Sequence, residues 1–172
     1  GLDCDTAFEN CLEVDELLQK SLQFAASYDF GYLTANVKDC GSGMKLSARV
    51  HLPAMAFLDE IGPFFESIVS KGVVAGPAFS SFVKAGAGIG NFYQLSSNQA
   101  GTGSELEQLI NFTAVLKQTV EFERKCRESI IRSRATEITD RIVKGFSVAK
   151  FSLLLDLREA LMIISDIKLG KA

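Results

Sequence analysis

Four cysteines are the residues of this 172-residue sequence whose type and number most directly imply chemistry: Cys4, Cys11, Cys40 and Cys126. An even count is typical of a disulfide-linked extracellular protein. On one helix the first two would lie about 10 Å apart, at roughly 1.5 Å per residue, whereas a disulfide requires Cα atoms within about 7 Å. We therefore expect two disulfides in which each N-terminal cysteine pairs with Cys40 or Cys126. Four free thiols are the alternative.

The other reactive residues predict neither a catalytic site nor a metal site. His51 is the only histidine, so a two-histidine metal site is excluded. It lies between Val50 and Leu52, which indicates packing, although a Ser–His–Asp triad assembled in space is the alternative. Three Ser-x-x-Lys pairs occur without the other motifs of an enzyme family, so we interpret them as coincidence. We expect no enzymatic activity and no cofactor.

A glycine-rich segment, 86–90, has the composition of a nucleotide-binding loop but not its pattern. The glycine spacing differs from the dinucleotide fingerprint, and the Gly-Lys-Ser/Thr sequence of a phosphate-binding loop is missing. Glycine at this density is also typical of a tight connection between closely packed helices. The sequence therefore predicts a structural connection here.

Aromatic residues cluster in the middle third of the chain and could line a cavity. Large apolar rings either fill a core or surround an apolar ligand, and short helices next to a glycine-rich hinge could form a gate. The candidate lining residues are Phe57, Phe64, Phe65, Phe79, Phe82, Phe92 and Tyr93. They favour a carrier of a small apolar molecule.

Composition narrows the class of protein further. Hydrophobic residues make up 47% of the chain, which predicts a globular core, and the net charge of −3 disfavours nucleic-acid binding. No apolar run approaches the roughly 18 residues that a membrane-spanning helix needs. Asn111-Phe112-Thr113 is a glycosylation sequon, and the chain begins without methionine, as a processed secreted protein would.

The clearest helix signal runs from Ser104 to Arg134. Ser104 and Glu107 form the sequence pattern of a capping box, in which each side chain satisfies a backbone N–H of the first turn. Apolar residues then recur at helical spacing. The pattern predicts a central helix with neighbours on several sides.

Weaker signals predict further helices on both sides of this one. A first helix is expected over 3–28, and proline and glycine positions predict short helices over 53–61, 63–71 and 77–85. Short strands joined by turns are the alternative for that region. Gly145 is expected to end one helix and Ser147 to cap a final long one.

Together these signals predict an all-α fold, a single-domain bundle of about six to eight helices over residues 1–172, cross-linked by two disulfides. The leading functional hypothesis is a secreted binding protein with an apolar ligand or a protein partner. The alternative is an extracellular structural or interaction domain that assembles with itself or with a partner chain.

Overall fold

The computed structural model describes residues 3–79, 88–98 and 104–170 of the chain. These residues form two compact units. Unit 1 comprises Gly1–Leu46 and Ser97–Ala114, and unit 2 comprises Ser47–Ser96 and Val115–Ala172. Each unit is described by itself. The expectation of a single domain over the whole chain stays a prediction.

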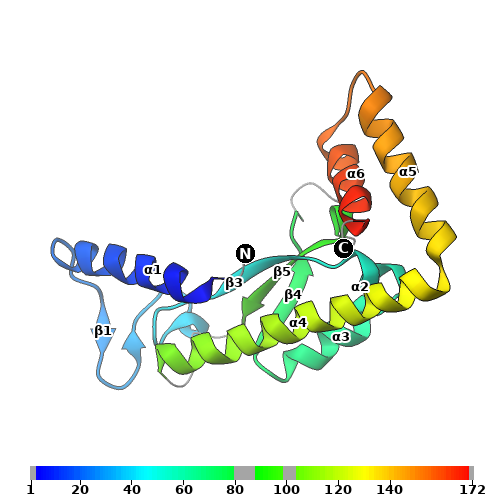
Figure 1. The fold of residues 1–172 in the computed structure, drawn as a ribbon. Coiled ribbons are helices and arrows are strands. Elements are labelled where there is room, and N and C mark those ends of the chain that lie inside the picture. Colours follow the sequence, from blue (N-terminus) through cyan, green and yellow to red (C-terminus); the bar gives the residue numbers. More distant parts are fainter. Residues whose placement is uncertain (1–2, 80–87, 99–103, 171–172) are drawn as a thin grey trace. The chain divides into compact units, whose positions relative to one another are not determined.

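Unit 1 contains a helix, a small hairpin and the beginning of a long helix (Figure 1). Asp3 caps the first helix by accepting the Thr6 N–H at 3.1 Å, which fits the preference for aspartate at this position. The elements are α1 (Cys4–Gln19), β1 (Ala26–Ser27), β2 (Gly31–Tyr32), the 3-10 helix η1 (Val37–Asp39) and the first turns of α4 (Glu105–Ser133).

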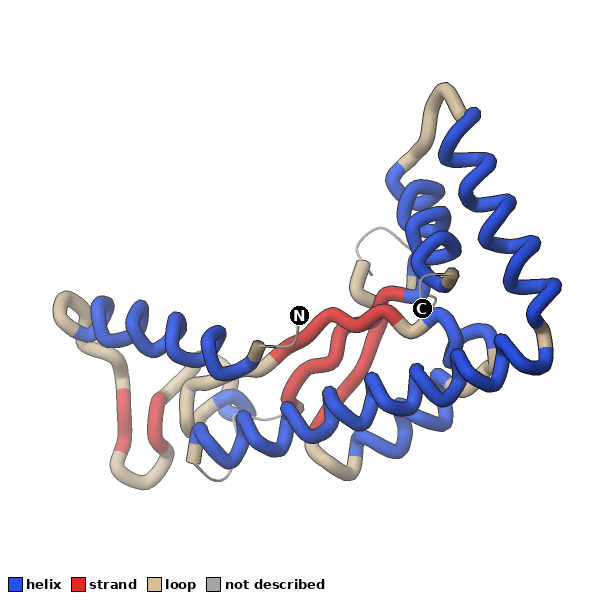
Figure 2. The backbone as a smooth tube through the Cα atoms, in the orientation of Figure 1, coloured by secondary structure: helices blue, strands red, loops and turns tan. Residues whose placement is uncertain are grey.

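Unit 2 is built on a three-stranded sheet with the strand order β3-β5-β4, drawn in red in Figure 2. Strands β3 and β5 are antiparallel, in a register that places Val50 opposite Tyr93. The strands are β3 (Ser47–His51), β4 (Val73–Pro77) and β5 (Phe92–Ser97). The helices are α2 (Pro53–Phe57), α3 (Ile61–Val69), the rest of α4, α5 (Ala135–Phe151) and α6 (Leu157–Leu169), and η3 (Ile89–Asn91) is a short 3-10 helix.

The core of unit 2 lies between this sheet and its helices. Phe65 on α3 meets Tyr93 on β5 edge to face at 5.2 Å, and Phe64 stacks on Phe122 of α4 at 5.1 Å. Helix α3 therefore contacts the sheet with one ring and α4 with the next. The largest apolar side chains at 2% exposure or less complete the core: Leu52, Met55, Ile68, Val73, Leu95, Leu116 and Ile130.

The prediction of an all-α fold is wrong, because the sheet is formed by three segments in which the sequence pattern predicts either a helix or no regular element. These segments carry valines and aromatic residues, which favour strands. They are only five or six residues long, and a run this short shows no decisive period. Of the helix expected over 77–85, residue 77 ends β4, and residues 80–87 lie outside the described part of the chain.

The helix predictions were better where capping and proline signals existed. The Ser104 capping box is confirmed, since the Ser104 N–H donates to Glu107 Oε2 at 3.1 Å and the Glu107 N–H donates to Ser104 Oγ at 3.2 Å. Pro53 begins α2 as expected. The first helix ends at Gln19 instead of residue 28, and α5 continues through Gly145.

The disulfide prediction is also wrong, because all four cysteines are free thiols. Cys126 is buried in the core of unit 2, whereas Cys4, Cys11 and Cys40 belong to unit 1. An even number of cysteines does not show that any two of them lie close enough to form a disulfide. Among the helices that the structure describes, none has the length and apolar character needed to cross a membrane.

Candidate active site

Residues 33–45 of unit 1, hereafter the 33–45 loop, are held in a defined shape by short-range hydrogen bonds. Tyr32 and Gly41 exchange two backbone hydrogen bonds, of 2.8 and 3.2 Å, and these close the first part of the loop. Within it, the Thr34 hydroxyl donates to the Asn36 carbonyl at 2.7 Å. Asn36 Nδ2 donates to Asp39 Oδ2 at 3.1 Å. The carboxylate of Asp39 is therefore fixed by its own loop.

The second part of this loop leads into the sheet. Gly43 has a left-handed backbone with φ of 71°, and the Met44 N–H donates to the Ser42 hydroxyl at 3.2 Å. Ser42 in turn donates to Gln108 on α4 at 3.3 Å. Lys45 follows directly, so its position is set by a hydrogen-bonded turn on one side and by the start of β3 on the other.

One pocket of about 330 Å³ lies along the 33–45 loop and has both signs of charge on its wall. Asp39 is the carboxylate among its lining residues and Lys45 is the ammonium; the rest of the wall is formed by Thr34, Ala35, Asn36, Gly43, Met44 and Ser97. A carboxylate can pair with a guanidinium and an ammonium with a phosphate. The pocket can therefore hold a cationic group and an anionic group side by side.

A second pocket of about 450 Å³ shares Lys45 with the first and extends over α1. Its wall is largely apolar, with Phe8, Leu12 and Phe24 among its lining residues. A volume of this order and a mostly apolar wall with a few polar groups are the usual properties of a small-molecule site. Lys45 thus lies where two cavities of unit 1 meet.

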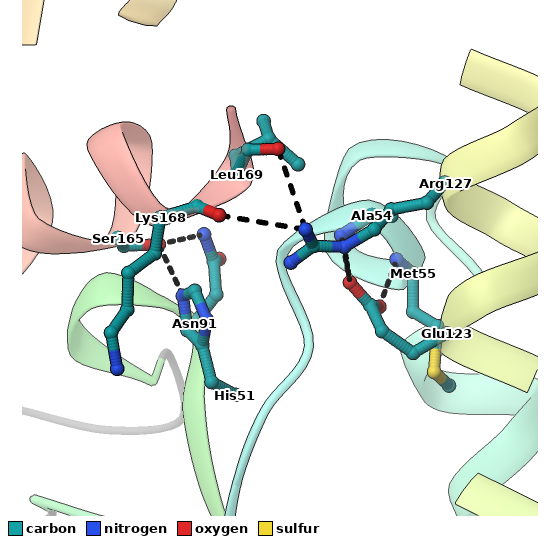
Figure 3. A network of polar contacts seen from close by, with 9 residues as sticks. All are labelled: His51, Ala54, Met55, Asn91, Glu123, Arg127, Ser165, Lys168 and Leu169. Atoms are coloured by element: carbon teal, nitrogen blue, oxygen red, sulfur yellow. Dashed lines mark hydrogen bonds and ion pairs between the residues drawn. The ribbon is translucent and has the colours of Figure 1, made fainter. Parts of the chain in front are cut away.

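Unit 2 contains a separate network of polar side chains (Figure 3). Glu123 on α4 accepts the backbone N–H groups of Ala54 and Met55, each at 3.0 Å, and its Oε1 lies 3.4 Å from Arg127 Nε. Burial raises the pKa of Glu123, while these donors act in the opposite direction. Arg127 Nη1 also reaches the carbonyls of Lys168 and Leu169 at 3.5 Å, so one arginine joins α4 to the end of α6.

The same network includes the single histidine. His51 Nε2 lies 2.9 Å from Ser165 Oγ, which also accepts a hydrogen bond from Asn91 Nδ2 at 3.1 Å (Figure 3). The imidazole stacks on Phe92. Burial, then the charges of Lys168 and Arg127, lower the pKa of His51 to about 4. None of these contacts brings a carboxylate to His51, so the described residues form no Ser–His–Asp triad with it.

Comparison with known proteins identifies the family of the chain. Residues 1–126 match the profile of the ATP:guanido phosphotransferase C-terminal catalytic domain. The chain belongs to this family. All the described residues that line the two pockets of unit 1 lie within the matched range.

Several bacterial relatives carry the name protein-arginine kinase. The protein of Halothermothrix orenii is 31% identical over 170 residues, which cover 99% of this chain and 48% of that protein. The protein of Clostridium novyi is 33% identical over 171 residues, with 99% and 48% covered. The chain thus spans about half the length of the curated relatives it matches.

A solved structure supports the fold assignment. The duplicated taurocyamine kinase from Schistosoma mansoni, with bound transition state analog components, matches 69% of this chain and 16% of that chain, with a TM-score of 0.54 and 19% sequence identity. At this identity the likeness concerns the fold alone. It agrees with the mixed α/β architecture.

Membership of a guanido phosphotransferase family overturns the functional predictions. The expectation of a secreted binding protein for an apolar ligand is wrong, and so is the expectation that the chain is no enzyme. The alternative of an extracellular structural domain is wrong for the same reason. The free thiols also remove the disulfides that would indicate secretion.

The described aromatic residues of the predicted cavity contact other side chains of unit 2. Phe79 contacts Phe92 edge to face at 6.0 Å, in addition to the pairs made by Phe64 and Phe65, and the Arg134 guanidinium lies over the Phe57 ring. None of the six that the structure describes lines either pocket of unit 1. Phe82 lies outside the described residues. Asn111 is exposed on α4, but the secretory setting in which its sequon would matter is not supported.

Asp39 and Lys45 were not selected from the sequence. The segment 32–39 showed no clear period, and Gly41-Ser42-Gly43 was interpreted only as a loop. The signal that could have found them is a short glycine-rich turn followed by a lysine two residues before a strand, since glycine lets the backbone approach a ligand closely.

Proposed function

We propose that this chain forms the catalytic part of a kinase that transfers the γ-phosphoryl group of ATP to the guanidinium of arginine in a protein substrate. The proposal is supported by the family of the chain and by the name that its bacterial relatives carry. The single structural observation in its favour is that Asp39 and Lys45 line one pocket of unit 1.

Lys45 suits the nucleotide side of this reaction. Phosphoryl transfer depends mainly on positioning and on cations that offset the charge of the phosphate oxygens. An ammonium group at the meeting point of two cavities can contact these oxygens while the larger, mostly apolar cavity accepts the rest of the nucleotide.

Asp39 suits the arginine side. An arginine side chain stays protonated in water, because its pKa exceeds 12. As phosphorus bonds to one guanidinium nitrogen, the bond from phosphorus to the β–γ bridging oxygen breaks, ADP leaves, and the nitrogen must lose a proton. The Asp39 carboxylate can first pair with the guanidinium and then accept that proton.

The test is an assay of protein-arginine phosphorylation by the natural protein in its full length. The protein is incubated with ATP, Mg²⁺ and an arginine-containing protein, and the acid-labile phosphoarginine is measured by mass spectrometry. Lys45→Met removes the ammonium group and keeps most of the side-chain volume. We expect it to lower the rate at least about 10²-fold, the usual cost of losing a preorganised charge. Asp39→Asn is expected to lower the rate to a similar extent.

Matched substitutions control for unspecific effects of charge. Lys125→Met and Asp29→Asn remove the same groups from exposed positions that line neither pocket, and both should leave the rate unchanged. A wild-type protein without phosphoarginine product would overturn the proposed function. Full activity of both pocket variants would overturn the assignment of the site.

A further inference from the structure

A small pocket in unit 2 has no role in the proposed reaction. Its volume is about 140 Å³, and it lies where η3 meets α5 and α6. Residues 88–91 form one wall, and the side chains on the helices are Arg141, Arg158, Met162 and Ser165. Among the described residues, two cations and no carboxylate line it.

The two arginines differ in how far they are already paired. Arg141 donates its Nε–H to Asp166 Oδ1 at 2.5 Å, and its four Nη–H donors have no partner among the described residues. Arg158, exposed at the start of α6, has no hydrogen bond or ion pair within the described ranges. Since Asp166 offsets the charge of Arg141, the pocket keeps one excess positive charge. The Nη–H groups of Arg141 and the guanidinium of Arg158 stay available as hydrogen-bond donors.

The opposite wall adds polar groups on a rigid backbone. Gly90 and Asn91 both have left-handed backbones, with φ of 60° and 57°. A Cβ at Gly90 would collide with the Leu161 carbonyl oxygen, so only glycine allows this wall to approach α6 so closely. Asn91 uses one Nδ2–H for Ser165, which leaves the second amide hydrogen of that group for another acceptor.

We propose that this pocket binds a small tetrahedral oxyanion, with free phosphate as the expected ligand. Its volume is below the roughly 300 Å³ at which small-molecule pockets begin, so a nucleotide does not fit, but it exceeds the space of one water molecule. Arginine forks match the oxygens of a phosphate. No carboxylate among the described lining residues opposes the anion.

Binding is measured directly, so the result does not depend on kinase activity. The ¹⁵N-labelled protein is titrated with sodium phosphate at pH 7, with sodium chloride adjusted to keep the ionic strength constant. We expect the amide resonances of Gly90 and Asn91 to shift and to saturate. In Arg158→Gln the dissociation constant should rise at least tenfold, because the unpaired fork is lost.

Arg124→Gln is the matched control, since Arg124 is exposed on the unit 2 part of α4 and lines no part of this pocket. It removes the same charge and should leave the dissociation constant within twofold of the wild type. The dispersion of each spectrum shows whether the variant is folded. Shifts that stay linear with phosphate, or equal effects of the two substitutions, would overturn the proposal.

Discussion

His51 is held on two sides, by the Ser165 hydroxyl at 2.9 Å from Nε2 and by the ring of Phe92 at 4.6 Å. Its pKa is lowered to about 4 from an ordinary value of 6.5. The folded protein therefore binds this proton more weakly than the unfolded chain, so stability is complete above pH 6.5 and falls as the pH drops from 6.5 toward 4. In this range we expect the free energy of unfolding to fall with decreasing pH. The slope should stay below about 1.4 kcal/mol per pH unit, because water screens a partly exposed ring.

The titration can be read without interference, because the chain has one histidine. The imidazole resonances followed by NMR between pH 3.5 and 8 should report a pKa well below 6.5, and urea unfolding of His51→Gln should lose this part of the pH dependence. An imidazole that titrates near 6.5 in the folded protein would contradict the prediction.

Glu123 shows how one buried carboxylate can support several elements. Its side chain accepts two backbone N–H groups of α2 and pairs with Arg127. Glu123→Ala leaves two buried backbone donors without an acceptor and removes the carboxylate partner of Arg127, so we expect the free energy of unfolding to fall by about 3–5 kcal/mol. Glu123→Gln keeps one acceptor oxygen and should cost about 1–3 kcal/mol. Urea unfolding followed by circular dichroism measures both.

Glu121, two positions earlier on the same helix, is exposed and provides the control. Glu121→Ala should change stability by less than about 0.5 kcal/mol. If the substitutions at 121 and 123 have equal effects, the network around Glu123 does not stabilise the fold.

Single residues also show where sequence reasoning stops. The packing of His51 was predicted from its apolar neighbours, and the structure confirms that it is partly buried between a ring and a helix. Asp39 and Lys45 gave no comparable signal, because their proximity depends on the hydrogen bonds within the 33–45 loop and on the pair between Tyr32 and Gly41, which no periodicity encodes.

At the scale of elements, Gly145 explains how α5 and α6 approach each other. It is buried within α5, and a Cβ added there would lie 3.3 Å from Asp166 Cβ and 3.7 Å from the Ile163 carbonyl oxygen. Gly145→Leu should therefore lower the free energy of unfolding by about 1–3 kcal/mol through overpacking. In Gly145→Ala the tight contact opposes a gain of about 1 kcal/mol in helix propensity, so the net change should stay below about 1 kcal/mol.

Ala149 lies one turn later on an exposed part of α5 and tests whether a larger side chain is harmful in itself. Ala149→Leu should leave the thermal unfolding midpoint within about 2 °C of the wild type. The prediction fails if both leucine variants unfold at the same temperature.

The elements that the sequence predicted are those with a local chemical signal. Ser104 and Glu107 specify the start of α4 through two hydrogen bonds. The same rule applies at α6, where Asp156 and Glu159 form a capping box. The prediction that Ser147 caps the last helix is wrong, because Ser147 lies inside α5. The strands lacked such signals, because the register of β3 and β5 is set by partners more than 40 residues apart.

At the scale of the whole molecule, the sequence predicted a globular core but neither the α/β fold nor an enzyme. Length and apolar content specify how much surface can be buried and not which elements bury it. The expected disulfides contributed to the wrong fold prediction. A disulfide at Cys126 would have joined the N-terminal helix to α4 across more than 110 residues, which favours a cross-linked bundle. The family was identified from a match that extends over residues 1–126. No single short motif in the sequence indicated it.

The state of the cysteines can be tested on the intact chain. If all four thiols are free, the denatured protein without reductant should react with four equivalents of a chromogenic disulfide reagent. In the folded protein, exposed Cys11 should react first. Cys126 should react last, because burial, then the charges of Glu123 and Glu60, raise its thiol pKa and lower the fraction of reactive thiolate. A denatured chain with no reactive thiol would restore both disulfides, and a Cys126 that reacts as fast as Cys11 would contradict its place in the core of unit 2.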